Sequence, residues 1–114
     1  MNNSLQVFQN FLLSIGFSEK EAGVYIVLLT LGKGTVTQIA RKAGINRTTG
    51  YTVLDGLVVK GVVTVSGKEP KQEYVTESPD TILQMLRRKQ RHANEELERA
   101  QIMIPQIKIY STPW

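Results

Sequence analysis

The sequence predicts a mainly α-helical fold of the α+β type, with a three-helix core, a two-stranded β wing and a long C-terminal helix. Three observations lead to this prediction. Apolar residues recur at helical spacing in five segments. Ser, Thr or Asn stands where several of these segments begin, which is typical of helix caps. A short β-branched run, followed by Gly and Pro, lies before the last segment and favours a hairpin.

The first two helices are predicted at the N-terminus. The first is indicated by a stripe of apolar residues that Gly16 ends: Leu5, Phe8, Phe11, Leu12 and Ile15. The second follows Ser18, which stands three residues before Glu21 as in a capping box. It ends at Leu31 and Gly32, and its inward face is expected to carry Ala22, Tyr25, Ile26 and Leu29.

Two further helices follow in close succession. Thr35 and Gln38 form a second capping box before a short helix that Gly44 ends. Asn46 is a favourable N-cap for the next helix, predicted over 47–59. The inward residues expected on these two helices are Ile39, Ala40 and Ala43, then Tyr51, Leu54, Leu57 and Val58.

From Val62 to Val75 the apolar residues no longer follow helical spacing. Residues 62–66 and 72–75 are expected to pair as a β hairpin whose tip carries Lys68 and Lys71. Ser78 and Pro79 then predict the start of a long helix to about Met103, with Pro105 breaking or kinking it. We therefore expect a first domain over residues 1–77 and a long helix with a short tail over 78–114.

The basic residues are concentrated in the middle of the chain. Residues 33–75 hold seven Lys or Arg and three acidic residues, so this segment carries a net charge of +4, equal to that of the whole chain. A basic segment between nearly neutral ends favours a polyanionic partner. There is no cysteine, His92 is the only histidine, and no nucleophile elbow or Gly-rich phosphate loop is present. We therefore expect a protein without cofactor, metal or enzymatic activity, placed in the cytoplasm with the nucleoid and not in a membrane.

Three helices followed by a hairpin is the order of a winged helix-turn-helix. Two short helices joined by a tight Gly-containing turn pack at a steep angle, so that the second can enter the major groove of DNA. That recognition helix is predicted over 47–59, with the wing lysines on flanking backbone. The candidate DNA-binding residues are Gln38, Arg41, Lys42, Asn46, Arg47, Thr48, Thr49, Tyr51, Thr52, Lys68 and Lys71.

Several of these residues also have a simpler interpretation. The alternative for Arg47 and the threonines is an ordinary polar helix surface, and Asn46 is favoured as a cap over a base-reading residue. Tyr51 is favoured as a core residue with a solvated hydroxyl. Gly50 is expected to let the backbone approach DNA closely.

At this point the residues resemble a known family. The run from Gly16 to Val63, with the junction Glu73–Asp80, is similar to the TrmB family of archaeal and bacterial winged-helix transcription regulators. The resemblance implies an N-terminal DNA-binding domain, a homodimer formed through the long helix, and action as a repressor or activator. Many members also carry a C-terminal sugar-sensing domain. This chain has no room for one, which implies a short form or a piece of a longer protein.

The long helix is expected to bury its apolar stripe against a second copy of the chain. The central Gln90 weakens that stripe, and the first helix is expected to support it. The predicted dimerisation residues are Leu5, Phe8, Leu12, Leu83, Leu86, Ala93, Leu97, Ala100 and Ile104. The alternative to DNA binding is a winged-helix module for protein–protein contacts in a transcription or chromosome assembly. Whether a small-molecule effector binds is left open.

Overall fold

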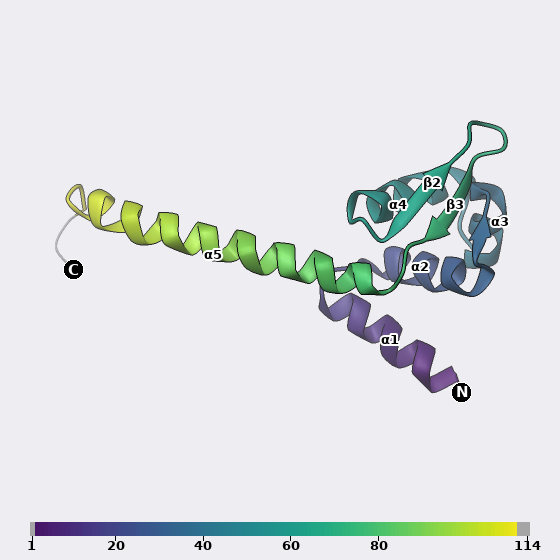
Figure 1. Ribbon diagram of the computed structural model, residues 1–114, viewed down its shortest axis with the longest axis horizontal. Helices are drawn as coiled ribbons and strands as arrows, with labels where there is room; N and C mark the ends of the chain where they lie inside the picture. The colour runs from purple at the N-terminus through teal and green to yellow at the C-terminus, as the bar shows by residue number, and fades with distance from the viewer. Residues whose placement is uncertain (1, 112–114) are drawn as a thin grey trace. The chain divides into compact units, whose positions relative to one another are not determined.

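The computed structural model describes residues 2–111, and the chain divides into two compact units, Met1–Thr81 and Ile82–Trp114. The first unit contains four helices, three short strands and the start of a fifth helix (Figure 1). The second unit contains the rest of that long helix. In chain order the elements are α1 (Asn2–Ser14), α2 (Glu19–Leu31), β1 (Lys33–Gly34), α3 (Val36–Ala43), α4 (Arg47–Val59), β2 (Val63–Ser66), β3 (Glu73–Thr76) and α5 (Asp80–Lys108).

The predicted caps define where the helices begin. The Ser18 hydroxyl accepts a hydrogen bond from the backbone N–H of Glu21, and the Glu21 carboxylate accepts one from the N–H of Ser18. Thr35 and Gln38 form the same reciprocal pair before α3. These bonds satisfy N–H groups that the first turn of a helix leaves without partners. Both capping boxes predicted from the sequence are therefore confirmed.

The wing belongs to a three-stranded antiparallel sheet with the strand order β1-β3-β2. The sequence predicted the β2–β3 hairpin but not β1, whose two residues pair with β3 in the register Lys33↔Val75 and Gly34↔Tyr74. β1 lies directly before α3 in the chain. The sheet therefore links the start of the helix-turn-helix to the base of the wing.

The core of the first unit lies among α1, α2, α3, α4 and the sheet. Its fully enclosed side chains include Leu28, Ile39, Leu54 and Val62. The inward faces differ in part from those predicted. In α2, Val24 and Leu28 are buried where Ile26 and Leu29 were expected, and in α4, Val53 is buried whereas Tyr51 and Val58 are half-buried. The apolar residues of these helices extend around more than one face, so sequence spacing alone does not select the buried one.

The long helix α5 continues past the position where it was expected to stop. Pro105 lies inside it, and the helix ends only at Lys108. A proline removes a single backbone N–H, so the helix can continue on the hydrogen bonds that remain on either side of it.

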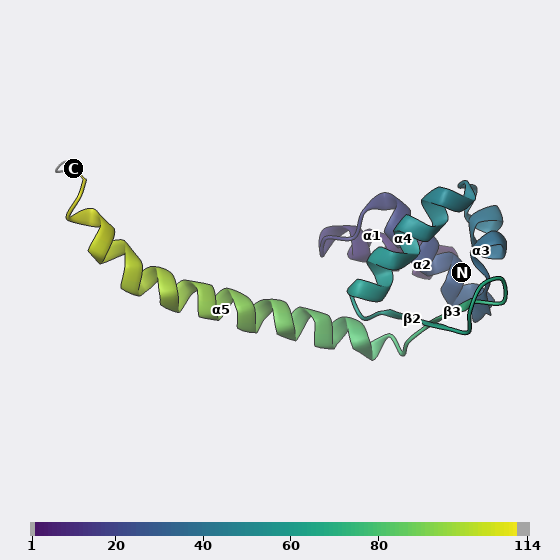
Figure 2. The ribbon, with the colours of Figure 1, turned by 90° about the horizontal axis from the view of Figure 1, so that it is seen from above.

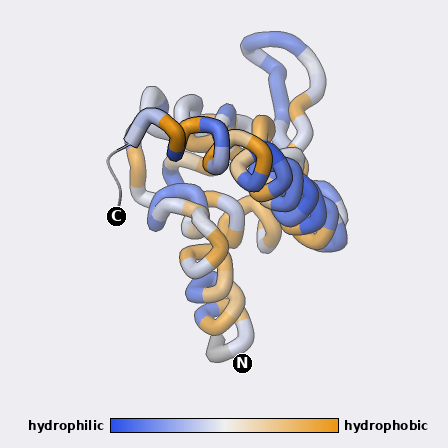
Figure 3. The backbone as a smooth tube through the Cα atoms, turned by 90° about the vertical axis from the view of Figure 1, so that its left-hand side faces the viewer, coloured by the Kyte–Doolittle hydropathy of each residue, from blue (hydrophilic) through white to orange (hydrophobic). Residues whose placement is uncertain are grey.

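Figure 3 shows hydrophilic residues through the middle of α5. Within residues 2–111, none of the helices combines the length and the apolar character that crossing a membrane requires.

Candidate nucleic-acid interface

The helix predicted to read DNA is α4, and its bounds agree with the prediction. α3 and α4 lie side by side (Figures 1 and 2) and are joined by a tight turn in which Gly44 is left-handed, with φ of 75°. Gly50 faces α3, because a Cβ atom there would lie 3.1 Å from Cγ2 of Val36. Gly50 was expected to let the backbone approach DNA, but it is buried, and its close approach is to α3 inside the domain.

The first turn of α4 is polar and open to solvent. Arg47 and Thr48 are exposed and Thr49 is half-buried, and Thr52 in the next turn is also exposed. Asn46 is exposed and acts as the cap, because its side-chain oxygen accepts a hydrogen bond of 2.7 Å from the N–H of Thr49. This bond uses only the side-chain oxygen of Asn46, so the two N–H donors of the amide take no part in the cap. The leading end of the helix therefore presents a cation, hydroxyl groups and an amide.

The Arg47 side chain contacts two residues that the sequence analysis did not connect with it. Nη2 of Arg47 lies 3.3 Å from the Tyr51 hydroxyl and 3.6 Å from Oε2 of Glu69, in the turn between β2 and β3. The Tyr51 hydroxyl donates a hydrogen bond of 2.5 Å to Oε1 of Glu69. The hydrogen bond with Tyr51, with the nearby Glu69 carboxylate, raises the pKa of Arg47, so the guanidinium remains cationic.

Tyr51 therefore differs from the core residue that was favoured. It is half-buried, and its hydroxyl joins α4 to the wing. Glu69 was missed as a site residue. The available signal was an acidic residue between two lysines at the hairpin tip, in a segment that is otherwise basic.

The remaining predicted DNA-binding residues lie on two other elements. On α3, Gln38, Arg41 and Lys42 are exposed, although Gln38 is also bound in its capping box. Lys68 and Lys71 are exposed in the wing, where the N–H of Lys71 donates to the carbonyl of Lys68 at 2.8 Å. The first unit thus carries basic groups on α3, α4 and the wing.

The residues predicted for dimerisation lie on two helices, α1 and α5. Leu12 is fully buried in the part of the chain where α1 packs on α2, so it belongs to the core of the first unit. Leu5 is exposed and Phe8 is half-buried. In α5, Leu86 is half-buried, and the exposed predicted residues are Leu83, Ala93, Leu97, Ala100 and Ile104.

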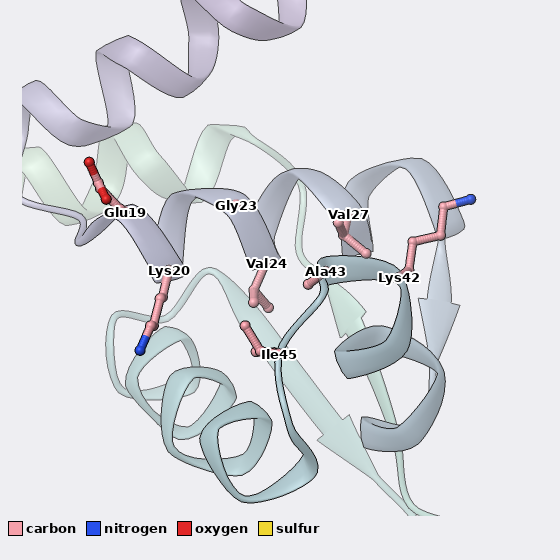
Figure 4. A pocket seen from close by; sticks show the side chains of 8 residues that line it. All are labelled: Glu19, Lys20, Gly23, Val24, Val27, Lys42, Ala43 and Ile45. Atoms are coloured by element: carbon pink, nitrogen blue, oxygen red, sulfur yellow. The ribbon is translucent and has the colours of Figure 1, made fainter.

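A cavity of about 300 Å³ lies between α2 and the turn from α3 to α4. Val24, Val27, Ala43 and Ile45 contribute apolar walls (Figure 4). The Lys20 and Lys42 side chains extend from it in different directions in Figure 4. Ligand sites normally combine an apolar wall with polar groups that converge on the ligand. These lysines do not converge, so the cavity itself indicates no ligand class.

Comparison with known proteins decides the family. The family described as "Sugar-specific transcriptional regulator TrmB" matches residues 12–80, which include the helix-turn-helix and the wing. The chain belongs to the TrmB family. This membership confirms the resemblance seen in the sequence.

Two relatives of this TrmB-family chain show how much of a longer protein it matches. The chain is 32% identical over 83 residues to the HTH-type sugar sensing transcriptional regulator TrmBL1 of Pyrococcus furiosus, a match covering 73% of this chain and 23% of that protein. It is 31% identical over 100 residues to the uncharacterized protein YrhO of Bacillus subtilis, covering 87% of this chain and 33% of YrhO. The chain thus spans a third or less of the length of these relatives.

Solved structures confirm the fold of the TrmB-family chain. TrmBL2, described as an archaeal chromatin protein with a novel mode of DNA binding, matches with a TM-score of 0.76 and 20% identity, over 96% of this chain and 47% of that one. A MarR family transcriptional regulator from Silicibacter pomeroyi matches with a TM-score of 0.56 and 17% identity, over 99% of this chain and 84% of that one. At these identities the similarity establishes the winged-helix fold.

Proposed function

We propose that this TrmB-family chain is a sequence-specific, double-stranded DNA-binding transcription regulator that acts as a homodimer. The leading end of α4 enters the major groove, with Arg47 and the neighbouring threonines facing the bases and phosphates. Lys68 and Lys71 contact the flanking backbone. The protein would act in the cytoplasm, at the nucleoid.

One observation supports this proposal above the others. α4 buries Val53, Leu54 and Leu57 in its own domain, while its first turn keeps Arg47 and Thr48 exposed. A helix that is anchored on one face and polar at its leading end fits a groove lined by phosphates. A surface for protein contacts would more often present apolar or acidic residues there. Membership of a family of transcription regulators supports the same conclusion.

The homodimer is proposed from the exposed apolar residues of α5. Leu83, Leu97 and Ile104 are 51%, 57% and 49% exposed, although leucine and isoleucine usually lie inside proteins. They share the heptad spacing of a coiled-coil seam. We therefore assign DNA binding to residues 1–77 and pairing with a second copy to residues 78–114. Two recognition helices in one dimer would occupy successive major grooves roughly 34 Å apart and favour a pseudo-palindrome.

The salt dependence of binding tests whether the partner is DNA. The affinity of the chain for a labelled duplex of random sequence is measured by fluorescence anisotropy at a series of KCl concentrations. Neutralising about four to eight phosphates per dimer predicts that log K falls linearly with log[KCl], with a slope of about −4 to −7. Undetectable binding at low salt, or an affinity independent of salt, would contradict the proposal and favour a protein partner.

A further inference from the structure

The acidic side chain of Glu69 lies on the surface that we propose faces DNA, and it contacts the cation at the start of α4. Arg47, Tyr51 and Glu69 form a closed set of contacts: Arg47 with the Tyr51 hydroxyl, that hydroxyl with Glu69, and Glu69 with Arg47. The Arg47 guanidinium also lies 5.7 Å from the centroid of the Tyr51 ring. The side chains of Arg47 and Glu69 are 58% and 50% exposed, so both remain within reach of a ligand.

A carboxylate at this place acts against sequence-independent binding. A phosphate that approaches Arg47 must displace Glu69 from the guanidinium or share the guanidinium with it. In either case two negative charges come close together, which is unfavourable. The contact between Arg47 and a phosphate therefore yields less affinity than it would without Glu69.

A guanine base does not meet the same obstacle. Its major-groove edge offers two neutral acceptors, N7 and O6, to a guanidinium. Arginine has five N–H donors, so one edge of the group can bind guanine while another stays with Glu69. Glu69 thus opposes the phosphate contact of Arg47 more than the base contact.

From these contacts we propose that Glu69 is a specificity-determining residue, which lowers the affinity of the domain for non-specific DNA by holding Arg47 away from phosphates. This inference rests on the proposed DNA-binding function. It adds a role for the wing. The wing lysines attract the DNA backbone, whereas Glu69, which lies between them in the sequence, opposes the contact of Arg47 with a phosphate.

A pair of matched variants tests this role. Glu69→Gln keeps the shape of the side chain and removes its charge. Glu73→Gln makes the same charge change on β3 of the same hairpin, and within residues 2–111 Glu73 forms no ion pair with Arg47. The affinity of the wild-type chain and both variants is measured for a duplex of random sequence and for the duplex that the wild-type chain selects from a random pool. Thermal melting of each variant confirms that it is folded.

We expect Glu69→Gln to bind the random duplex about two- to fivefold more tightly than Glu73→Gln, since exposed ion pairs have modest effects. Its salt dependence should steepen by about 0.9 per protomer, because Arg47 then neutralises one more phosphate. The affinity for the selected duplex should change by less, so that the ratio of specific to random binding falls.

Two results would overturn the inference while the wild-type chain still binds DNA. One is that Glu69→Gln binds the random duplex no more tightly than Glu73→Gln. The other is that Glu69→Gln weakens both duplexes by the same factor, as expected if Glu69 only holds the wing in place. If the wild-type chain binds neither duplex at low salt, the proposed function itself fails, and the role of Glu69 fails with it.

Discussion

Gly50 of α4 lies against Val36 of α3, so close that a Cβ atom at Gly50 would be 3.1 Å from Cγ2 of Val36 and 3.3 Å from Cβ of Ala40. α3 and α4 therefore approach each other at a position where a side chain would have to push them apart. This contact sets the distance between α4 and the helix that precedes it. It is a packing feature of the helix-turn-helix itself.

Gly50→Val is expected to lower the free energy of unfolding by about 1 to 3 kcal/mol, because the added methyl groups overpack the contact with α3. Chemical denaturation measures the change. Gly23→Ala in α2 is the control: apart from its chain neighbours and the backbone of its own helix, no described atom lies within 4 Å of its Cβ position, so it should raise the stability by up to about 1 kcal/mol through helix propensity. Equal stability of Gly50→Val and the wild-type chain would show that α3 and α4 do not pack at this glycine.

The hydroxyl of Tyr25 is buried in the core of the first unit, and among the described residues it has no hydrogen-bond partner. A buried hydroxyl without a partner costs free energy that its removal recovers. Tyr25→Phe should therefore keep the stability of the wild-type chain or raise it by up to about 1 kcal/mol, as measured by urea unfolding at neutral pH. A loss of more than about 1 kcal/mol would mean that the hydroxyl is bonded, for instance to an enclosed water molecule.

The same burial predicts how stability depends on alkaline pH. Burial raises the pKa of Tyr25 above its ordinary value of 10.0, because the charged form is poorly solvated in the core. Above pH 10 the unfolded chain therefore loses this proton while the folded chain retains it, and the free energy of unfolding falls as the pH rises from about 10 towards the folded-state pKa. Tyr25→Phe should show a shallower fall. Burial also raises the pKa of Tyr74, which preserves part of the slope in that variant.

Leu97→Glu tests the proposed coiled-coil seam along α5. Leu97 is 57% exposed, so a charge there should leave the chain folded but should disrupt a coiled coil that buries this position. Light scattering is expected to give the mass of a dimer for the wild-type chain and that of a monomer for the variant. Glu96→Gln, at a neighbouring exposed position outside the predicted stripe, should remain a dimer. A dimeric Leu97→Glu variant would contradict the proposed seam.

Arg47→Ala addresses the leading end of α4. Because Arg47 is exposed, the free energy of unfolding should stay within about 0.5 kcal/mol of the wild-type value. The affinity for the selected duplex should fall by roughly ten- to a hundredfold, since a two-pronged arginine–guanine contact contributes about 1 to 3 kcal/mol. Electrophoretic mobility shift assays measure this loss. Unchanged affinity would mean that Arg47 does not take part in recognition.

Local signals made the helices of the first unit predictable. Ser18 and Glu21, and Thr35 and Gln38, are three residues apart, and their capping boxes depend on little outside that turn. The left-handed Gly44 and the cap at Asn46 are equally local, which is why the bounds of α4 were predicted correctly. The position of the candidate recognition helix therefore follows from its own sequence.

The features that the sequence analysis missed depend on contacts between distant residues. β1 consists of Lys33 and Gly34, neither of which favours strands, and it forms only because β3 lies beside it. The contact between Tyr51 and Glu69 joins residues 18 positions apart, from α4 to the turn between β2 and β3. Periodicity describes which face of a helix is apolar, whereas these two contacts require β3 to lie beside β1 and the β2–β3 turn to lie near Tyr51 of α4.

Guanine methylation at N7 is the most direct test of the claim that the leading end of α4 lies in the major groove, because N7 faces only that groove. In the duplex selected by the wild-type chain, methylation should interfere with binding at guanines in two clusters about 10 base pairs apart. With Arg47→Ala, interference should disappear at the guanine that Arg47 contacts and persist elsewhere. Binding that is insensitive to N7 methylation throughout the selected duplex would contradict a recognition helix in the major groove.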